Sequence, residues 1–134
     1  MKVNINADVG ESFGRYPLGT DEDLIPLIGS ASIACGMHAG DPTTMVKTIK
    51  IALDAAVSIG AHPGFDDRWG FGRRQVQMDT SDLENLVAYQ IGALKALAAA
   101  RKWTLDFAGH ADFTKTVKRD YMAAKTTIAD IGMK

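Results

Sequence analysis

The sequence predicts an α/β protein of repeated strand–helix units around a parallel sheet. Short apolar segments typical of strands are each followed by a segment with helical periodicity, four times along the chain. No linker or low-complexity tract interrupts this order. Such alternation favours parallel strands joined by right-handed crossovers. A chain of 134 residues, 46% of them apolar, can bury one core, so we expect residues 1–134 to form a single domain.

Four strands and four helices follow from these patterns. The predicted strands cover residues 2–7, 32–35, 57–61 and 103–108. The predicted helices cover residues 20–28, 42–56, 81–101 and 116–131. Asp41 and Pro42 form the clearest helix start, since aspartate caps helices and proline fits the first helical position. We expect Thr20 to cap the first helix, and Ser81 with Glu84 to form a capping box for the third.

Composition excludes several classes of partner. The net charge is −1 and no basic stripe is present, so nucleic acid is not an expected partner. No apolar run approaches the roughly 20 residues that span a bilayer. The N-terminus lacks the pattern of a signal peptide, and the one cysteine, Cys35, cannot form an internal disulfide. We therefore expect a soluble cytoplasmic protein that binds neither nucleic acid nor membrane.

Candidate catalytic residues lie where the predicted strands end. Asp8 follows the first strand, and His38, His62 and His110 follow the next three. The loops after parallel strands meet on one face, where sites are usually built. We predict Asp8, His38 and His62 as catalytic residues, with His110 as a further candidate. Asp8 and the first two histidines could bind a divalent metal; they could equally serve as acid and base without one, or each histidine could simply hydrogen-bond its own loop.

Four further residues are predicted to bind substrate. Glu11 lies close to Asp8 in sequence, so one carboxylate could raise the pKa of the other, although Glu11 could also be merely solvated. Asp41 caps a helix whose N-terminal amides could also hold an anion. Arg73 and Arg74 could clamp a carboxylate or phosphate, or form surface salt bridges.

Several segments of the chain carry motifs of one family. They are NADVGES at 6–12, ACGMHAGDP at 34–42, GAHPG at 60–64, FGRR at 71–74 and YQIGAL at 89–94. Over residues 1–104 the chain thus resembles the LamB/YcsF, or lactam-utilisation, family. The resemblance implies the first half of a distorted β/α barrel related to deacetylase-like folds. It also implies the A-subunit role of 5-oxoprolinase, the ATP-dependent opening of the 5-oxoproline lactam to L-glutamate together with B and C subunits. The expectation that ATP takes part comes from the resemblance alone, because the sequence has no P-loop motif.

The sequence departs from the family pattern after Leu105. His110 aligns with the family histidine only across a gap, and an ungapped alignment places Thr116 there. The chain ends at Lys134, about halfway through a typical family member. The alternative expectation is therefore a truncated, catalytically inactive remnant or a small-ligand binding module. An incomplete barrel would expose two sheet edges, which favours a homo-oligomer.

Overall fold

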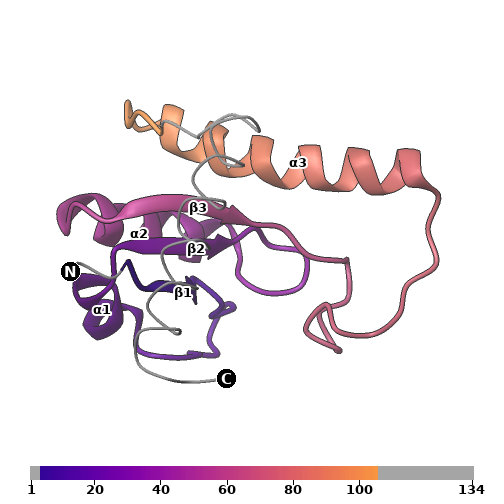
Figure 1. The fold of residues 1–134 in the computed structure, drawn as a ribbon, viewed down its shortest axis with the longest axis horizontal. Coiled ribbons are helices and arrows are strands. Elements are labelled where there is room, and N and C mark those ends of the chain that lie inside the picture. The colour runs from indigo at the N-terminus through magenta and orange to yellow at the C-terminus, as the bar shows by residue number, and fades with distance from the viewer. Residues whose placement is uncertain (1–3, 106–134) are drawn as a thin grey trace, which may run out of the picture.

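The computed structural model describes residues 4–105, and it contains a three-stranded parallel sheet with helices between the strands (Figure 1). The strands are β1 (Asn6–Val9), β2 (Ser30–Ala34) and β3 (Ser58–His62), hydrogen-bonded in that order. The helices are α1 (Asp21–Leu24), the 3₁₀ turn η1 (Ile25–Leu27), α2 (Pro42–Asp54) and α3 (Thr80–Ala99). Both strand pairs are parallel, which confirms the predicted α/β class. The described sheet is open and forms a partial β/α unit, with the carboxyl ends of its strands on the same side.

One face of the sheet is apolar and holds the core. Val9, Ala31 and Ile33 are buried there, in one cluster with Ile49 and Ala52 of α2. Side chains alternate between the two faces of a strand, so the apolar residues of β1 and β2 fall on the side that α2 covers. Burial of these side chains fixes the register of the sheet, because a slip by one residue would turn all of them to the other face.

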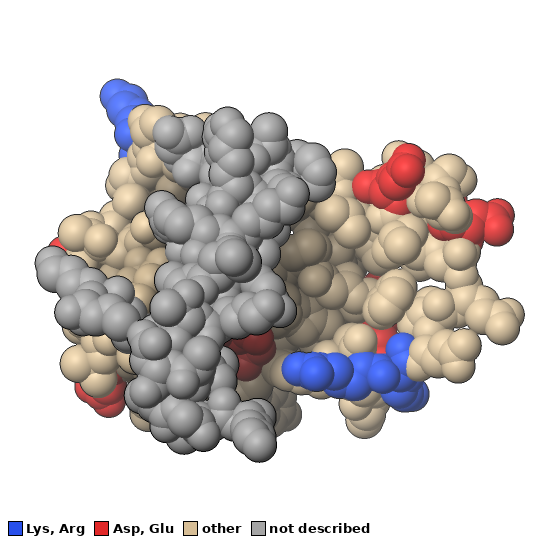
Figure 2. Space-filling view, in the orientation of Figure 1, with Lys and Arg blue, Asp and Glu red and all other residues tan. Residues whose placement is uncertain are grey.

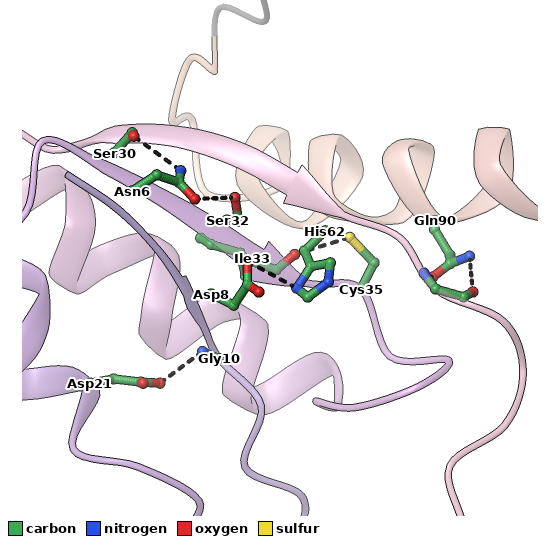
Figure 3. A network of polar contacts seen from close by, with 11 residues as sticks. Asn6, Asp8, Gly10, Asp21, Ser30, Ser32, Ile33, Cys35, His62 and Gln90 are labelled. Atoms are coloured by element: carbon green, nitrogen blue, oxygen red, sulfur yellow. Dashed lines mark hydrogen bonds and ion pairs between the residues drawn. The ribbon is translucent and has the colours of Figure 1, made fainter. Parts of the chain in front are cut away.

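The opposite face of β1 and β2 is polar. Asn6 donates from Nδ2 to Ser30 Oγ at 3.0 Å and accepts from Ser32 Oγ at 3.2 Å (Figure 3). Asp8 follows Asn6 by two residues, so its side chain extends on the same face. Asp8 therefore lies on this polar face, near the carboxyl edge of the sheet.

Strand ends differ from the predicted ones at two site residues. β1 continues to Val9, which pairs with Ile33, and β3 continues to His62, which pairs with Ala34. Asp8 and His62 are thus strand residues, whereas the sequence pattern predicts them as the first residues of the following loops. The backbone pairing holds both side chains more firmly than a loop would.

The helix starts agree with the sequence to different degrees. Asp41 caps α2, and Pro42 is its first residue, as predicted. Thr20 is the N-cap residue of α1, as predicted, but its side chain makes no capping bond. The capping box of Ser81 and Glu84 is wrong, because α3 begins at Thr80 and Asp79 is its N-cap without a side-chain bond. The short first helix tightens into the 3₁₀ turn at Pro26.

The last predicted elements fall largely outside the described residues. Residues 103–105 form no strand, and the rest of the predicted strand 103–108, the helix 116–131 and His110 lie outside residues 4–105. Within that range, no helix is long and apolar enough to cross a membrane. On the face seen in Figure 2, the visible acidic and basic side chains lie in separate small groups.

Candidate functional site

Three ligand-type side chains meet at the carboxyl edge of the sheet. Glu11 comes from the loop after β1, His38 from the loop after β2, and His62 ends β3. One oxygen of Glu11 and one nitrogen of each imidazole lie within 4.8 Å of one another. We call these three residues, together with Asp8, the strand-end cluster. The structure therefore brings together three predicted catalytic residues and one predicted substrate-binding residue.

Asp8 contacts His62 across the central strand. Its Oδ1 lies 3.5 Å from Nδ1 of His62 (Figure 3). The two residues belong to β1 and β3, and β2 separates these strands. Asp8 pairs with Ser32 of β2, which in turn pairs with Gly60 of β3. Because Ser32 and Gly60 are small, the side chains of Asp8 and His62 can meet above β2. A carboxylate placed in this way stabilises a protonated imidazole and orients a neutral one.

His38 is enclosed by the loop after β3. It is 3% exposed, and a Cβ on Gly64 would lie 2.2 Å from its Nδ1. A Cβ on Gly72 would lie 2.8 Å from the Cβ of His38. The ring lies edge-on to Phe71 at 5.5 Å and 4.5 Å from the ring of His62. Among the described residues, neither ring nitrogen of His38 has a hydrogen-bond partner.

Burial and charge move two pKa values of the cluster in opposite directions. Burial lowers the pKa of His38, and the neighbouring His62 and the cationic Arg73 lower it further. Burial raises the pKa of Glu11, and the charge of Asp8 adds to this, against the opposing effects of His62 and Arg73. The predicted effect of Asp8 on its neighbouring carboxyl is thus present, although burial is the larger cause. Burial is the main cause of both shifts, and perturbed pKa values of this kind are typical of functional sites.

Cys35 lies beside the cluster as an unreactive thiol. It is buried, and its Sγ donates to the carbonyl of Ile33 at 3.3 Å (Figure 3). Burial raises the pKa of the thiol to about 11. It is therefore a packed side chain and not a nucleophile at neutral pH.

Gln90 of α3 holds the loop that covers His38. It is fully buried, accepts from the Gly64 amide at 3.0 Å and donates to the Gly64 carbonyl at 2.9 Å. Sequence reasoning misses this role, since Gln90 on an apolar helix predicts packing alone. The role could have been predicted from a single amide side chain on an apolar helix face, because a buried amide needs polar partners.

Arg74 is engaged inside the loop after β3. Its Nε donates to Oδ1 of the buried Asp67 at 2.8 Å, and its Nη2 contacts the same oxygen. The bond from Arg74 is the main cause that lowers the pKa of Asp67. Arg73, by contrast, lines the cavity next to the cluster. The two predicted substrate-binding arginines therefore have different surroundings.

Arg68 links the loops after β2 and β3, and no sequence motif singles it out. Its guanidinium donates to the carbonyl of Gly40 at 2.9 Å and also to that of Gly36. The same group lies over the ring of Phe13, 3.9 Å from its centre. This one side chain thus joins three segments around the site.

Asp41 is occupied by bonds to its own surroundings. It accepts from the amides of Thr43 and Thr44 at 2.8 and 2.9 Å, from Thr44 Oγ1 at 2.9 Å, and from the Gly14 amide at 2.9 Å. Burial alone would raise its pKa, but these bonds lower it on balance. The Gly40 amide donates to the carbonyl of Glu11 at 3.3 Å. The amides predicted to hold an anion are therefore bonded within the chain, and Asp41 lies outside the strand-end cluster.

A cavity of about 320 Å³ opens beside the cluster. Its lining includes His38, His62, Arg73, Phe65 and Phe71, with apolar residues of α3 on the far side. A larger cavity of about 490 Å³ lies between the loop 12–20 and α2, but no cluster residue lines it. An apolar cavity with a few convergent polar groups is typical of a small-molecule site, so the smaller cavity is the better candidate.

Comparison with known proteins places this chain in a family. The sequence model of the LamB/YcsF family matches residues 3–133. The chain belongs to the LamB/YcsF family. Among its curated relatives is the A subunit of 5-oxoprolinase from Thermococcus sibiricus, 53% identical over 105 residues, which cover 78% of this chain and 41% of that protein. Another is the 5-oxoprolinase A subunit from Azoarcus sp., 54% identical over 100 residues, 75% of this chain and 39% of the relative.

A solved structure agrees with the fold. The lactam utilization protein from Thermus thermophilus matches this LamB/YcsF chain with a TM-score of 0.74 and 44% identity. The match covers 78% of this chain and 42% of that one. The chain thus spans about two fifths of the length of the relatives that it matches.

Proposed function

We propose that this chain contributes the strand-end cluster to a 5-oxoprolinase-type site, which opens the lactam ring of 5-oxoproline to L-glutamate. One observation carries the proposal. Asp8, Glu11, His38 and His62 converge beside a cavity, on a chain 53% identical over 105 residues to a protein named as the A subunit of 5-oxoprolinase. We further propose that residues 1–134 fold as one incomplete β/α barrel.

The chemistry of a cyclic amide suits this set of side chains. Opening the ring by hydrolysis adds water across the carbon–nitrogen bond, so one group must accept a proton from water and another must protonate the leaving nitrogen. We assign the first role to His62, with Asp8 stabilising the imidazolium that forms. Glu11 lies within 4.8 Å of both histidines and is assigned as the proton donor, and buried His38 donates a hydrogen bond to the carbonyl oxygen.

Arg73 supplies the charge that a carboxylate substrate requires. It lines the cavity with the two histidines, while Arg74 is paired with Asp67. We propose that Arg73 binds the carboxylate of 5-oxoproline. We include ATP and the B- and C-type partner subunits in the proposal because of the family membership. We assign the use of ATP to the partner subunits, since the cluster itself is assigned only the proton transfers and the binding of the carbonyl oxygen.

The test is turnover by the assembled system. The full chain, mixed with B- and C-type subunits, 5-oxoproline and ATP, is expected to release glutamate. His62→Ala should lower the rate by about 10²–10⁴-fold, the usual contribution of acid–base catalysis. Glu22→Gln is the matched control, because exposed Glu22 pairs with Lys47 away from the cluster and its loss should leave the rate unchanged.

A folded chain without turnover in this assay would contradict the proposal. Circular dichroism of the same sample establishes that the chain is folded. Titration with 5-oxoproline in a calorimeter then identifies the alternative: binding without turnover indicates a small-ligand binding module, and no binding indicates an inactive chain.

A further inference from the structure

We propose that Glu11, His38 and His62 bind one divalent transition-metal ion such as Zn²⁺. Asp8 does not bind the ion and instead orients the ring of His62. The inference deepens the proposed function and rests on it for the catalytic use of the ion. With the ion bound, Glu11, His38 and His62 serve as its ligands, and the proton-donor, hydrogen-bond-donor and base roles assigned to them above describe the metal-free chain. Binding itself can be measured without turnover, so the two can fail separately.

The first observation is the donor set and its spacing. Two imidazole nitrogens and one carboxylate oxygen lie within 4.8 Å of one another, on three different segments. Three such ligands that leave a coordination position open are the pattern of catalytic zinc and related divalent sites. Small movements of the side chains would allow each of the three atoms to lie roughly 2.0–2.2 Å from a zinc ion placed between them, the usual length of a zinc–ligand bond.

The second observation is an unsatisfied buried histidine. His38 is 3% exposed, and both its ring nitrogens are buried without a hydrogen-bond partner in the part of the chain that the structure describes. A buried polar group without a partner is costly, and native structures rarely leave one unexplained. A metal ion bound between His38 and His62 would satisfy one of these nitrogens directly.

The third observation is the contact between Asp8 and His62. Metal-binding histidines usually donate their other ring N–H to a carboxylate, which fixes the ring and strengthens the metal bond. Oδ1 of Asp8 lies 3.5 Å from Nδ1 of His62, and that nitrogen has no hydrogen bond among residues 4–105. We therefore assign Asp8 to Nδ1 and the ion to Nε2 of His62.

The assignment differs from the set that the sequence predicts. The sequence pattern groups Asp8 with the two histidines as metal ligands, whereas the geometry groups Glu11 with them. Bound at this position, the ion would lie beside the cavity and could polarise a carbonyl oxygen of the ligand.

The experiment measures metal binding by the full chain. Purified protein, freed of metal with a chelator, is titrated with Zn²⁺ in a calorimeter and with Co²⁺ followed by visible absorption. We expect one ion per chain and Co²⁺ bands typical of low coordination number. Asp8→Asn should weaken Zn²⁺ binding by about 10–100-fold, the usual effect of an outer partner. His38→Gln and Glu11→Gln should weaken it by more.

Controls separate the site from general metal binding and from misfolding. Glu22→Gln should bind Zn²⁺ like the wild type, since Glu22 is exposed and remote from the cluster. Thermal unfolding of each metal-free variant shows whether it is folded, and Zn²⁺ should raise the midpoint for the wild type but not for Glu11→Gln. Weak Zn²⁺ binding that the cluster variants leave unchanged would overturn the inference. Glutamate release that persists after metal removal would leave the proposed function standing without the ion.

Discussion

At the scale of single residues, His38 can take its position because two neighbouring residues are glycines and have no Cβ. Gly64 and Gly72 lie against its side chain, and a Cβ on either would come within 2.8 Å of a His38 atom. Glycine is required at these two positions because of this close approach. The ring of His38 is thereby held beside His62 with its nitrogens free of protein partners in the described chain.

Gly64→Ala should therefore disturb the cluster and the fold together. The added methyl would overlap Nδ1 of His38, so we expect a loss of about 1–3 kcal/mol in the free energy of unfolding, as for other overpacked sites. Urea unfolding measures it. Gly92→Ala is the matched control, because its Cβ would meet nothing within 4 Å and alanine favours the α3 helix by about 0.5–1 kcal/mol. Equal stability of the two variants would contradict the packing described for His38.

The residues of the candidate site could be predicted only in part. Asp8, His38 and His62 follow from their places at strand ends in specific motifs. Gln90 and Arg68 could not be found in this way, since their partners lie 26 and 28–32 residues away in sequence. Such contacts depend on how the loops close over the sheet, which no local pattern records.

At the scale of elements, the two long helices start differently. α2 begins at an aspartate with four hydrogen bonds from three residues, one of them in the loop after β1. α3 begins after Asp79, whose side chain makes no capping bond. The carboxylate of Asp41 therefore joins the start of α2 to the loop that carries Glu11.

Asp41→Ala should be the more costly of the two cap substitutions. Loss of an N-cap usually costs about 0.5–2 kcal/mol, and the bond to Gly14 places Asp41 at the upper end of this range. Asp79→Ala is the control and should cost less, because no side-chain bond is lost. Urea unfolding at about pH 7 compares the variants, and a larger effect for Asp79→Ala would contradict the assigned role.

The effect of Asp41→Ala should also depend on pH. The pKa of Asp41 is lower in the folded chain than the ordinary value of about 3.9 for the unfolded one. A carboxyl group with a lowered folded pKa stabilises the fold above its unfolded pKa, and this contribution is lost as the pH falls through the folded pKa. The difference between wild type and variant, measured by urea unfolding across the pH range, should thus be full near neutral pH and shrink below about pH 4.

At the scale of the whole molecule, the described sheet has two edges. β1 and β3 each pair with one neighbouring strand within residues 4–105. Ile5, next to β1, is 55% exposed. Unpaired strand edges with exposed apolar side chains offer a surface for a second chain.

We expect the chain by itself to associate through the β1 edge. Light scattering after size-exclusion chromatography should give a mass above that of one chain, which falls on dilution. Ile5→Lys should weaken this association, because a lysine at a strand edge opposes further pairing. Leu27→Lys is the control, since Leu27 is 76% exposed but belongs to η1 and not to a strand. A monomer at all concentrations would contradict this expectation.

Within residues 4–105, local sequence is sufficient to set the order of strands and helices, the apolar face of the sheet and the N-cap of α2 at Asp41. These features depend on alternation, periodicity and capping, which act between residues a few positions apart. Tertiary packing was needed to join Glu11 to the two histidines and to bring Asp8 to His62 across β2. It also separates the two arginines, because Arg74 pairs with Asp67 while Arg73 lines the cavity. Those relations depend on strand register and loop closure, which bring together segments that are distant in sequence.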